Sequence, residues 1–334
     1  MKAVVLTGIG GPERLEVREF DVPVLTGDRD LLVRVKAAGV NPIDAKQRKA
    51  GPLIQDRAPV ILGCDGAGVV ESVGLAVTCF RRGDEVYFLS GGIGGRPGTY
   101  AEYAVVDERL AASKPKNLRF AEAAVAPLAL ITAWESLERF GGVRAGQTVL
   151  VHGGAGGVGH LAVQLAARKG ARVLATVGNP GKAALTKKLG AVETICYKER
   201  DFVQEVLERT GGRGVDLALD TVGGETFVKT LSSVRPYGRV VTLLLPECGP
   251  EGFREARVRN LDLCFVWMLA PQFLGLTEEL ERQGRILREC IDWFEEGSLR
   301  VVVSKEFRLE DVAEAHRLIE TGSGTGKIAL IVSA

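Results

Sequence analysis

The sequence predicts an α/β fold in which a β-rich part is joined to a doubly wound parallel sheet. Short β-branched runs, separated by glycine, proline and aspartate, fill the first third of the chain. From Thr148 onward, apolar runs of five or six residues alternate with helical stretches, which is typical of a parallel sheet covered by helices on both faces. The chain also holds 42 glycines but only 13 prolines, so the glycines are expected to serve particular turns.

The expected elements follow this division. In the first third we expect strands at 31–35, 68–73 and 85–88, with little helical periodicity. The second part alternates helices with strands at 148–152, 172–177, 193–196, 215–220 and 239–245. After these we expect a helix at 277–296, a strand near 299–303, a helix at 309–321 and a last strand at 327–332.

The tail after the second part is too short to fold alone. We therefore expect it to pack onto the first segment, so that one domain is discontinuous. The expected division is one domain of residues 1–124 and 270–334, and a second of residues 125–269. For a chain of 334 residues, two domains agree with the usual domain size.

Composition excludes several classes of protein. The chain has 43 Lys and Arg against 42 Asp and Glu, a net charge of +1, so it lacks the basic footprint of a nucleic-acid or anionic-membrane binder. Its N-terminus has no signal-peptide core, and its longest apolar run, 263–276, is too short to span a bilayer. The six cysteines include no CxxC pair, which favours reduced thiols and a cytoplasmic protein over a disulfide framework or a zinc module.

A glycine-rich loop follows the strand at 148–152. Gly154, Gly156 and Gly159 form a GxGxxG pattern that opens an amphipathic helix, and a second apolar strand comes next. In this context the glycines allow a tight turn and a close approach of the backbone to a pyrophosphate, which the helix N-terminus attracts. The alternative is a tight turn with no ligand. The pattern predicts a dinucleotide site that includes Gly154, Ala155, Gly156, Gly157 and Val158.

The end of the second strand of this unit favours NADP(H) over NAD(H). An NAD site usually has an acidic residue there for the ribose 2′-hydroxyl, but no Asp or Glu occurs between residues 139 and 192, which hold eight Lys and Arg. The alternative for several of these lysines is a solvated helix face. The residues expected near a 2′-phosphate are Gly178, Asn179, Lys182 and Tyr197.

Over nearly its full length, the chain resembles the medium-chain dehydrogenases/reductases, in particular their zinc-independent, zeta-crystallin-like quinone oxidoreductase branch. This resemblance implies a GroES-like, substrate-facing domain built from both termini, a Rossmann domain, and an active cleft between them. The motifs that carry it are MKAVVLTGIGGPE at the start, GVNPIDAKQR at 39–48, ILGCDGAGVVESVG at 61–74, RRGDEVY at 81–87, GTYAEYAVV at 98–106, PLALITAWESL at 127–137, the glycine loop, DTVGGETF at 220–227 and GTGKIALIV at 324–332.

The chain departs from the zinc-bearing relatives at the positions of their metal ligands. Those relatives place a cysteine in the segment matching 39–44 and a His-Glu pair in the segment matching 63–66. Here these positions hold Asn41 and the pair Cys64 and Asp65, the segment 126–132 has no cysteine, and the chain's three histidines are scattered. Zinc needs three or four converging ligands, so we expect no metal site.

The resemblance also suggests roles for residues of the active site. Asn41 is the first choice for a polar group in the cleft, and Asp44 for holding that loop or the cofactor ribose; the alternatives are a turn role before Pro42 and a helix cap. Lys46 stands where many relatives carry a tyrosine, and Thr132 lies in a segment that lines the cofactor. We therefore take Asn41, Asp44, Lys46 and Thr132 as catalytic candidates.

Further residues are expected along the cofactor. Val222 follows the fourth strand of the second part, and Leu243 and Leu245 end the fifth. Lys327 resembles a lysine of the tail that comes near the cofactor, although a solvated surface position is the alternative.

Without zinc, an electron-poor acceptor is easier to reduce than an alcohol is to oxidise. The sequence thus predicts an NADPH-dependent reductase of a small quinone, enone or enal. The alternatives are an NADPH-binding protein without catalytic role and a membrane- or RNA-associated relative, which the balanced charge disfavours.

Residues 261–267 read as an apolar edge strand that would join its twin in a homodimer; coverage by the chain's own tail would leave a monomer.

Overall fold

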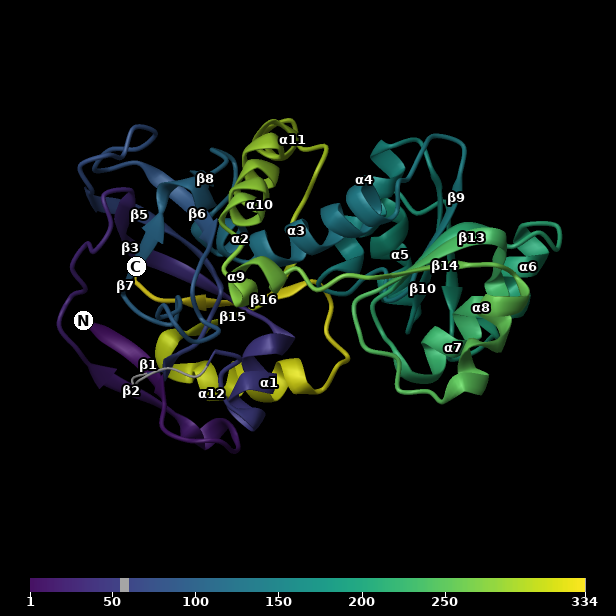
Figure 1. Cartoon of the computed structure of the whole chain (residues 1–334), viewed down its shortest axis with the longest axis horizontal. Coiled ribbons are helices and arrows are strands. Elements are labelled where there is room, and N and C mark those ends of the chain that lie inside the picture. Colours follow the sequence, from purple (N-terminus) through teal and green to yellow (C-terminus); the bar gives the residue numbers. More distant parts are fainter. Residues whose placement is uncertain (55–59, 334) are drawn as a thin grey trace. The chain divides into compact units, whose positions relative to one another are not determined.

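The computed structural model describes residues 1–54 and 60–333, and it divides the chain into two units (Figure 1). The first unit comprises Met1–Ile131 and Leu269–Ala334, and the second comprises Thr132–Met268. The first unit is therefore discontinuous in sequence. The division falls within helix α3 (Pro127–Trp134), whereas the expected boundary at residue 125 lies before that helix.

The first unit is built on a mixed sheet that contains strands from both ends of the chain. Within the described residues its order is β15-β16-β3-β5-β6-β8, with β7 also paired to β3. Strand β16 runs antiparallel to β3 and pairs Ile328 with Val40, so the tail belongs to the same sheet (Figure 1). A smaller sheet has the order β2-β1-β4. The strands are β1 (Lys2–Leu6), β2 (Leu15–Glu19), β3 (Asp30–Val40), β4 (Val60–Ile61), β5 (Asp65–Val73), β6 (Glu85–Leu89), β7 (Tyr103–Asp107), β8 (Ala111–Ser113), β15 (Val303–Arg308) and β16 (Lys327–Ile331).

This unit differs from the expectation at two helical segments and one strand. A helix α1 follows β3 directly, because Pro42 opens its first turn and the Asp44 carboxylate caps the Asn41 N–H. The expected helix at 277–296 is two helices separated at Cys290. The expected strand near 299–303 begins at Val303, because Leu299 turns back to donate its N–H to Trp293 O. The helices are η1 (Pro12–Arg14), α1 (Pro42–Ala50), η2 (Glu108–Leu110), α2 (Phe120–Ala124), α9 (Ala270–Leu274), α10 (Thr277–Glu289), α11 (Ile291–Glu295), η5 (Leu309–Asp311) and α12 (Val312–Glu320).

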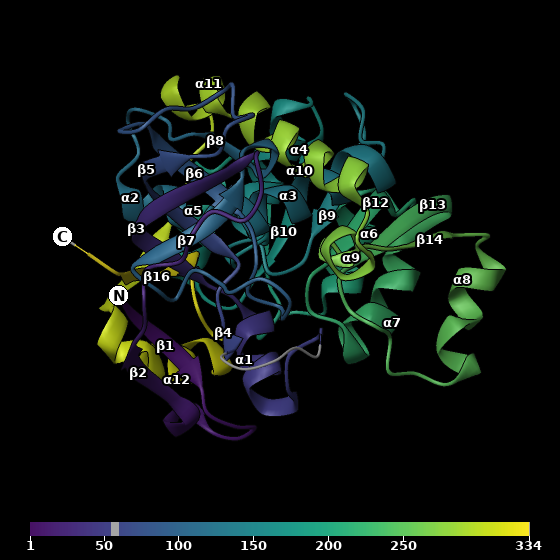
Figure 2. The same cartoon turned by 60° about the vertical axis from the view of Figure 1, so that its left-hand side comes forward.

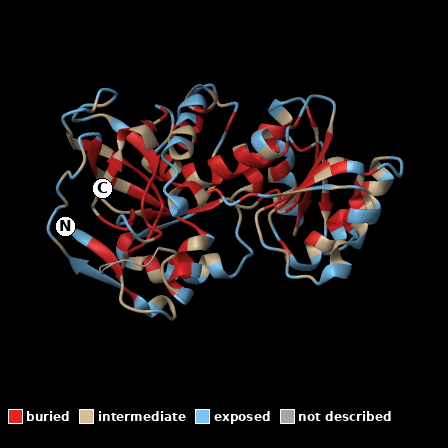
Figure 3. Ribbon diagram, in the orientation of Figure 1, coloured by how far each residue is buried: buried red, intermediate tan, exposed pale blue. Residues whose placement is uncertain are grey.

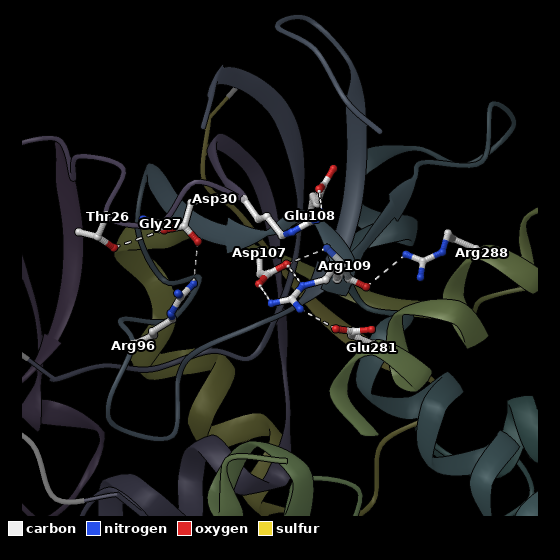
Figure 4. Close-up of polar contacts among 10 residues, drawn as sticks. Thr26, Gly27, Asp30, Arg96, Asp107, Glu108, Arg109, Glu281 and Arg288 are labelled. Carbon is white, nitrogen blue, oxygen red and sulfur yellow. Dashed lines mark hydrogen bonds and ion pairs between the residues drawn. The ribbon is translucent and has the colours of Figure 1, made fainter. Parts of the chain in front are cut away.

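Charged side chains fasten α10 of the tail to the loop at η2 (Figure 4). Arg109 binds Asp107 through two guanidinium nitrogens and also reaches Glu281 of α10 at 2.5 Å. In return, Arg288 of α10 donates to the Arg109 carbonyl at 3.2 Å. These contacts join segments about 170 residues apart in sequence and hold the tail in the first unit.

The second unit is a parallel sheet with the strand order β11-β10-β9-β12-β13-β14 (Figures 1 and 2). This is the order of a dinucleotide-binding fold, in which a ligand binds at the carboxyl ends of the strands. Three strands have the expected bounds, whereas β13 starts and ends earlier than expected because the chain leaves the sheet after Thr242. The elements are η3 (Glu135–Phe140), β9 (Thr148–Val151), α4 (Gly159–Arg168), β10 (Arg172–Val177), α5 (Pro180–Lys188), β11 (Glu193–Cys196), α6 (Phe202–Arg209), β12 (Val215–Asp220), α7 (Gly224–Ser233), β13 (Val234–Thr242), η4 (Pro250–Phe253), α8 (Arg254–Val258) and β14 (Asp262–Phe265).

Each unit has its own apolar core (Figure 3). In the second unit, strand residues such as Leu150 and Ala218 pack against Phe202 of α6 and Phe227 of α7. In the first, β1, β3 and β16 pack against Val312 of α12. Among the described residues, no helix has the length and apolar character needed to cross a membrane.

Candidate active site

Strand register brings three polar residues of the first unit together at the end of β3. The pairing of Ile328 with Val40 sets Lys327 beside Asn41, which follows β3 directly. On the other edge of β3, Gly39 pairs with Asp65 of β5. All three polar side chains are at most 5% exposed, so they form a buried cluster.

The contacts in this cluster fix the orientation of the Asn41 amide. Lys327 Nζ, which can only donate, binds Asn41 Oδ1. Asn41 Nδ2 donates to Asp65 Oδ2 at 2.9 Å, and the same oxygen lies 3.7 Å from Lys327 Nζ. An obligate donor and an anionic acceptor therefore assign both ends of the amide. The second hydrogen on Nδ2 has no partner among the described residues.

Burial and mutual attraction act in opposite directions on the charged pair. Burial lowers the pKa of Lys327 and raises that of Asp65, while the contact between the two opposes both changes. Asp65 is further supported by the Leu128 N–H, which donates to its Oδ1 at 2.8 Å. Each Asp65 oxygen therefore accepts a hydrogen bond, Oδ2 from Asn41 and Oδ1 from Leu128.

Asp44 lies in the same buried region, on α1. Its Oδ2 accepts from the Asn41 N–H at 2.8 Å and from the Tyr100 hydroxyl at 2.9 Å. Its Oδ1 is buried and has no hydrogen-bond partner among the described residues. Burial raises the pKa of Asp44 to about 7, against the lowering effect of these two donors.

The other two catalytic candidates lie outside this cluster. Lys46 is exposed on α1, on the face opposite the buried Asp44 and Arg48, because two residues are about half a helical turn. Thr132 is buried in α3, and its carbonyl accepts the Ser136 hydroxyl at 2.7 Å. The structure therefore brings Asn41 and Asp44 together, joined by Lys327, and leaves Lys46 on the exposed side of α1, whereas Thr132 begins the second unit.

In the second unit the glycine loop has the close packing that its sequence predicts. A Cβ on Gly154 would lie 2.7 Å from the Ala175 Cβ, and one on Gly159 would lie 2.1 Å from Gly153 O. No side chain fits at these positions, so the loop between β9 and α4 stays tight. Ala155 is buried, whereas Gly156, Gly157 and Val158 remain partly exposed at the carboxyl end of β9.

The residues expected near a 2′-phosphate gather at the end of β10. Asn179 caps α5 by accepting the Lys182 N–H at 2.9 Å. A Cβ on Gly178 would lie 3.2 Å from the Tyr197 hydroxyl, so that hydroxyl lies over the glycine. Burial and the neighbouring Lys198 lower the pKa of Lys182. The sequence reasoning missed Lys198, which directly follows Tyr197.

The segments after β12 and β13 are fixed by one buried carboxylate that the sequence reasoning also missed. Asp220 Oδ1 accepts the N–H groups of Val222 and Gly223, both at 2.9 Å. Its Oδ2 accepts the Thr242 hydroxyl at 2.8 Å, and its carbonyl accepts the Leu243 N–H at 3.1 Å. Val222 is about half exposed, and Leu245 is 83% exposed.

Comparison with known proteins identifies the family. The family model "Alcohol dehydrogenase GroES-like domain" matches residues 27–116, and "Zinc-binding dehydrogenase" matches residues 189–330. Quinone oxidoreductase of Homo sapiens is 31% identical over 99% of this chain and 98% of its own. The 2-methylene-furan-3-one reductase of Solanum lycopersicum is 35% identical over 99% of this chain and 79% of its own. The structure of Escherichia coli quinone oxidoreductase complexed with NADPH has a TM-score of 0.86 at 28% identity, covering 99% of this chain and 100% of that one.

The residues in the first unit do not fit the zinc that one family name implies. Cys64 is fully buried, and burial raises the pKa of its thiol well above its usual range, which disfavours the thiolate that zinc binds. The Lys327 ammonium already stands between Asn41 and Asp65. The described residues also contain no group of three His, Cys, Asp or Glu that could hold a metal ion.

Fold and sequence comparisons agree with each other. The GroES-like match falls on the strands of the first unit, and the parallel sheet of the second has the dinucleotide-binding order. The chain belongs to the medium-chain dehydrogenase/reductase superfamily, in its quinone oxidoreductase branch, and is an oxidoreductase of that family.

Proposed function

We propose that the protein is an NADPH-dependent reductase of a small quinone or an α,β-unsaturated carbonyl. The observation that carries this proposal is the fixed Asn41 amide, which has one unengaged N–H and a buried ammonium on its carbonyl oxygen. Such a preorganised donor stabilises negative charge that develops on an oxygen during reduction. The names of the human and tomato relatives point to the same two acceptor classes.

In this proposal the second unit holds the cofactor. The glycine loop fits a pyrophosphate because its backbone cannot be covered by side chains. Lys182, Lys198 and the Tyr197 hydroxyl supply the positive charge and the donor that a 2′-phosphate requires. The Escherichia coli relative binds NADPH in its solved structure. When bound, NADPH supplies a hydride.

Four further residues keep their expected places in the proposal. Val222, Leu243 and Leu245 follow the carboxyl ends of β12 and β13, where a parallel sheet of this order receives its ligand, and Thr132 is proposed to line the cofactor as well. Lys327 is proposed to orient Asn41; a direct contact with the cofactor is the alternative role. The two roles differ in their test, because loss of a cofactor ligand weakens NADPH binding whereas loss of an orienting charge lowers kcat.

The first experiment is an assay of NADPH oxidation over a panel of quinones, enones and enals. We expect turnover with at least one class and a slower rate with NADH. Asn41→Ala should lower kcat about 100-fold, as removal of an oxyanion donor does elsewhere, with NADPH affinity unchanged. Tight NADPH binding without turnover of any acceptor would instead favour a non-catalytic NADPH-binding protein. Protein treated with a chelator should keep its activity.

We also propose that the protein forms a homodimer through residues 261–267. Strand β14 lies at the edge of its sheet, and Phe265 and Trp267 are about half exposed. An apolar edge of this kind favours pairing with another strand, and a two-fold contact would close the assembly. The six free cysteines and the net charge of +1 agree with a cytoplasmic enzyme without nucleic-acid or membrane partners.

A further inference from the structure

A chain of buried side chains connects α12 of the tail to Asp44 on α1. Arg48 forms an ion pair with Glu320, and its Nε donates to His316 Nδ1 at 3.3 Å. His316 Nε2 lies 3.4 Å from the Tyr100 hydroxyl, which in turn lies 2.9 Å from Asp44 Oδ2. Arg48, Tyr100, His316 and Asp44 are all fully buried, and nothing in the proposed function uses the first three.

Arg48 fixes the direction of every hydrogen bond in this chain. A guanidinium has donors only, so His316 Nδ1 must accept and carries no proton. Burial and the nearby Arg48 lower the pKa of His316 to about 4, so the neutral ring carries its proton on Nε2. That N–H donates to the Tyr100 oxygen, which leaves the Tyr100 hydroxyl proton to point at Asp44 Oδ2.

This arrangement decides which oxygen of Asp44 can take a proton. Oδ2 already receives the Asn41 N–H and the Tyr100 O–H. Oδ1 receives nothing from the described residues and has no contact with solvent. A proton bound to Asp44 therefore sits on Oδ1, where it neutralises the negative charge on the oxygen that no donor of the described residues stabilises.

We propose that Asp44 is the proton store of the reduction, and that Tyr100, His316 and Arg48 are positioning residues that keep its proton on Oδ1. The proposal rests on the proposed function, because a reduced quinone or enone needs a proton as well as a hydride. Once the acceptor has taken up the hydride, the O–H bond at Asp44 Oδ1 breaks and an O–H or C–H bond forms on the product. Because Oδ1 has no contact with solvent in this state, the transfer requires a water molecule to reach Oδ1. That water carries the proton to the product, and solvent returns a proton to the carboxylate by the same route.

Several other groups influence the titration of Asp44. Asp65 raises its pKa and Lys327 lowers it, both by charge, and burial outweighs them and sets the value near 7. Cys64 and Tyr100 lie close enough to feel the Asp44 charge. Near α12, the Arg48 and Lys49 cations share the Glu320 carboxylate. This group of three side chains therefore carries one excess positive charge.

The test measures kcat against pH together with the infrared carbonyl band of a protonated carboxylic acid. In the wild type, kcat should fall above pH 7 as Asp44 ionises, and the infrared band should disappear over the same range. Asp44→Asn should remove both the band and the alkaline fall, and it should lower kcat about 10²- to 10⁴-fold. Tyr100→Phe removes a donor to the carboxylate, so both transitions should move up by about one to two pH units.

Tyr87→Phe is the matched control. Tyr87 is another fully buried tyrosine, and its hydroxyl donates to Leu287 O at 2.6 Å, apart from the hydrogen bonds that link Arg48, His316, Tyr100 and Asp44. The Tyr87→Phe variant should lose about as much stability as Tyr100→Phe, but it should move neither the kcat transition nor the infrared transition. A shift of both transitions in Tyr100→Phe alone supports the proposal. An infrared band that does not titrate, or one that shifts while the kcat profile stays in place, overturns it. An inactive wild type whose band titrates as expected would contradict the proposed function but not the assignment of the proton to Asp44.

Discussion

Asp65 can approach Asn41 because residue 39, between them, has no side chain. A Cβ on Gly39 would lie 2.8 Å from Asp65 Oδ2 and 3.0 Å from Ala124 O. Gly63 has a similar role for Tyr100: its φ is +91°, and a Cβ there would lie 2.5 Å from the Tyr100 ring. Two glycines therefore provide the space in which the buried polar cluster forms.

Gly39→Ala should disturb the cluster directly. The new methyl group would displace the Asp65 carboxylate from Asn41, because the Ala124 backbone blocks its other side. We expect a loss of about 1–3 kcal/mol in the free energy of unfolding, as for overpacking elsewhere, and a marked fall in kcat. Gly8→Ala is the control, since a Cβ there meets nothing within 4 Å. A Gly39→Ala enzyme with wild-type kcat would show that the position of Asp65 does not matter for turnover.

Lys182→Ala should weaken binding of NADPH about 10- to 100-fold and leave NADH nearly unchanged. The physical reason is the loss of a charge-assisted hydrogen bond to the 2′-phosphate, which is worth about 1.5–3 kcal/mol. Titration of each cofactor by fluorescence measures both affinities. Lys188→Ala provides a control on the exposed face of the same helix. An equal loss for NADPH and NADH would contradict the assignment of Lys182.

Strand β14 lies at one edge of its sheet, and its outer side has no paired strand among the described residues. Its residues pair with β13 on one side only. The Val266 N–H donates to Thr242 O at 3.0 Å, so this donor belongs to the chain's own sheet. Because successive N–H groups of a strand point to opposite sides, the Phe265 N–H points to the open edge.

Phe265→Pro should therefore convert a dimer to a monomer, because proline removes a donor from the pairing edge. Light scattering at micromolar concentration measures the change, from about twice the 35.7 kDa chain mass to one chain mass. Phe265→Ala, which keeps the N–H, separates the backbone effect from loss of the ring. A wild-type protein that scatters as a single chain would rule the dimer out.

At the scale of the whole molecule, several buried groups couple stability to pH. Burial lowers the pKa of His152 and of His316 to about 4, below the value of 6.5 for an unfolded histidine. Between these values the unfolded chain binds more protons, so each histidine makes stability rise with pH. Asp44 acts in the opposite sense, since its pKa is raised from 3.8 to about 7 and the folded protein binds the extra proton.

Between pH 4.5 and 6.5 the two histidines make the free energy of unfolding rise with pH, whereas Asp44 and Asp65, whose pKa values are raised, oppose this rise. Each group contributes a slope of at most about 1.4 kcal/mol per pH unit. Asp44→Asn removes one of the two opposing groups, so we expect its stability to rise more steeply with pH than that of the wild type. Denaturant unfolding at several pH values measures both slopes, and Asp28→Asn, at an exposed position, is the control. Equal slopes in Asp44→Asn and the wild type would contradict a raised pKa of Asp44.

The sequence by itself determined the elements whose signal is local. Mostly apolar runs between turns gave β10 and β12 their expected bounds, because a strand buried on both faces needs a largely apolar run. The glycine loop was equally readable, since its spacing reflects packing within one βα unit. The start of α1 could not be predicted from the sequence. Its nine mostly polar residues show no helical periodicity, and the helix depends on the cap at Asn41 and Asp44.

Only the tertiary structure decided how the polar residues are used. Asn41 and Lys327 are 286 residues apart, and the register of β16 on β3 places them together. Nothing local to Lys327 distinguishes a buried ammonium from a solvated one, and nothing near Tyr100 or His316 indicates that both act on Asp44. Sequence patterns record which residues are buried within one element, whereas the partners of a buried charge are set by the packing of segments far apart in the chain.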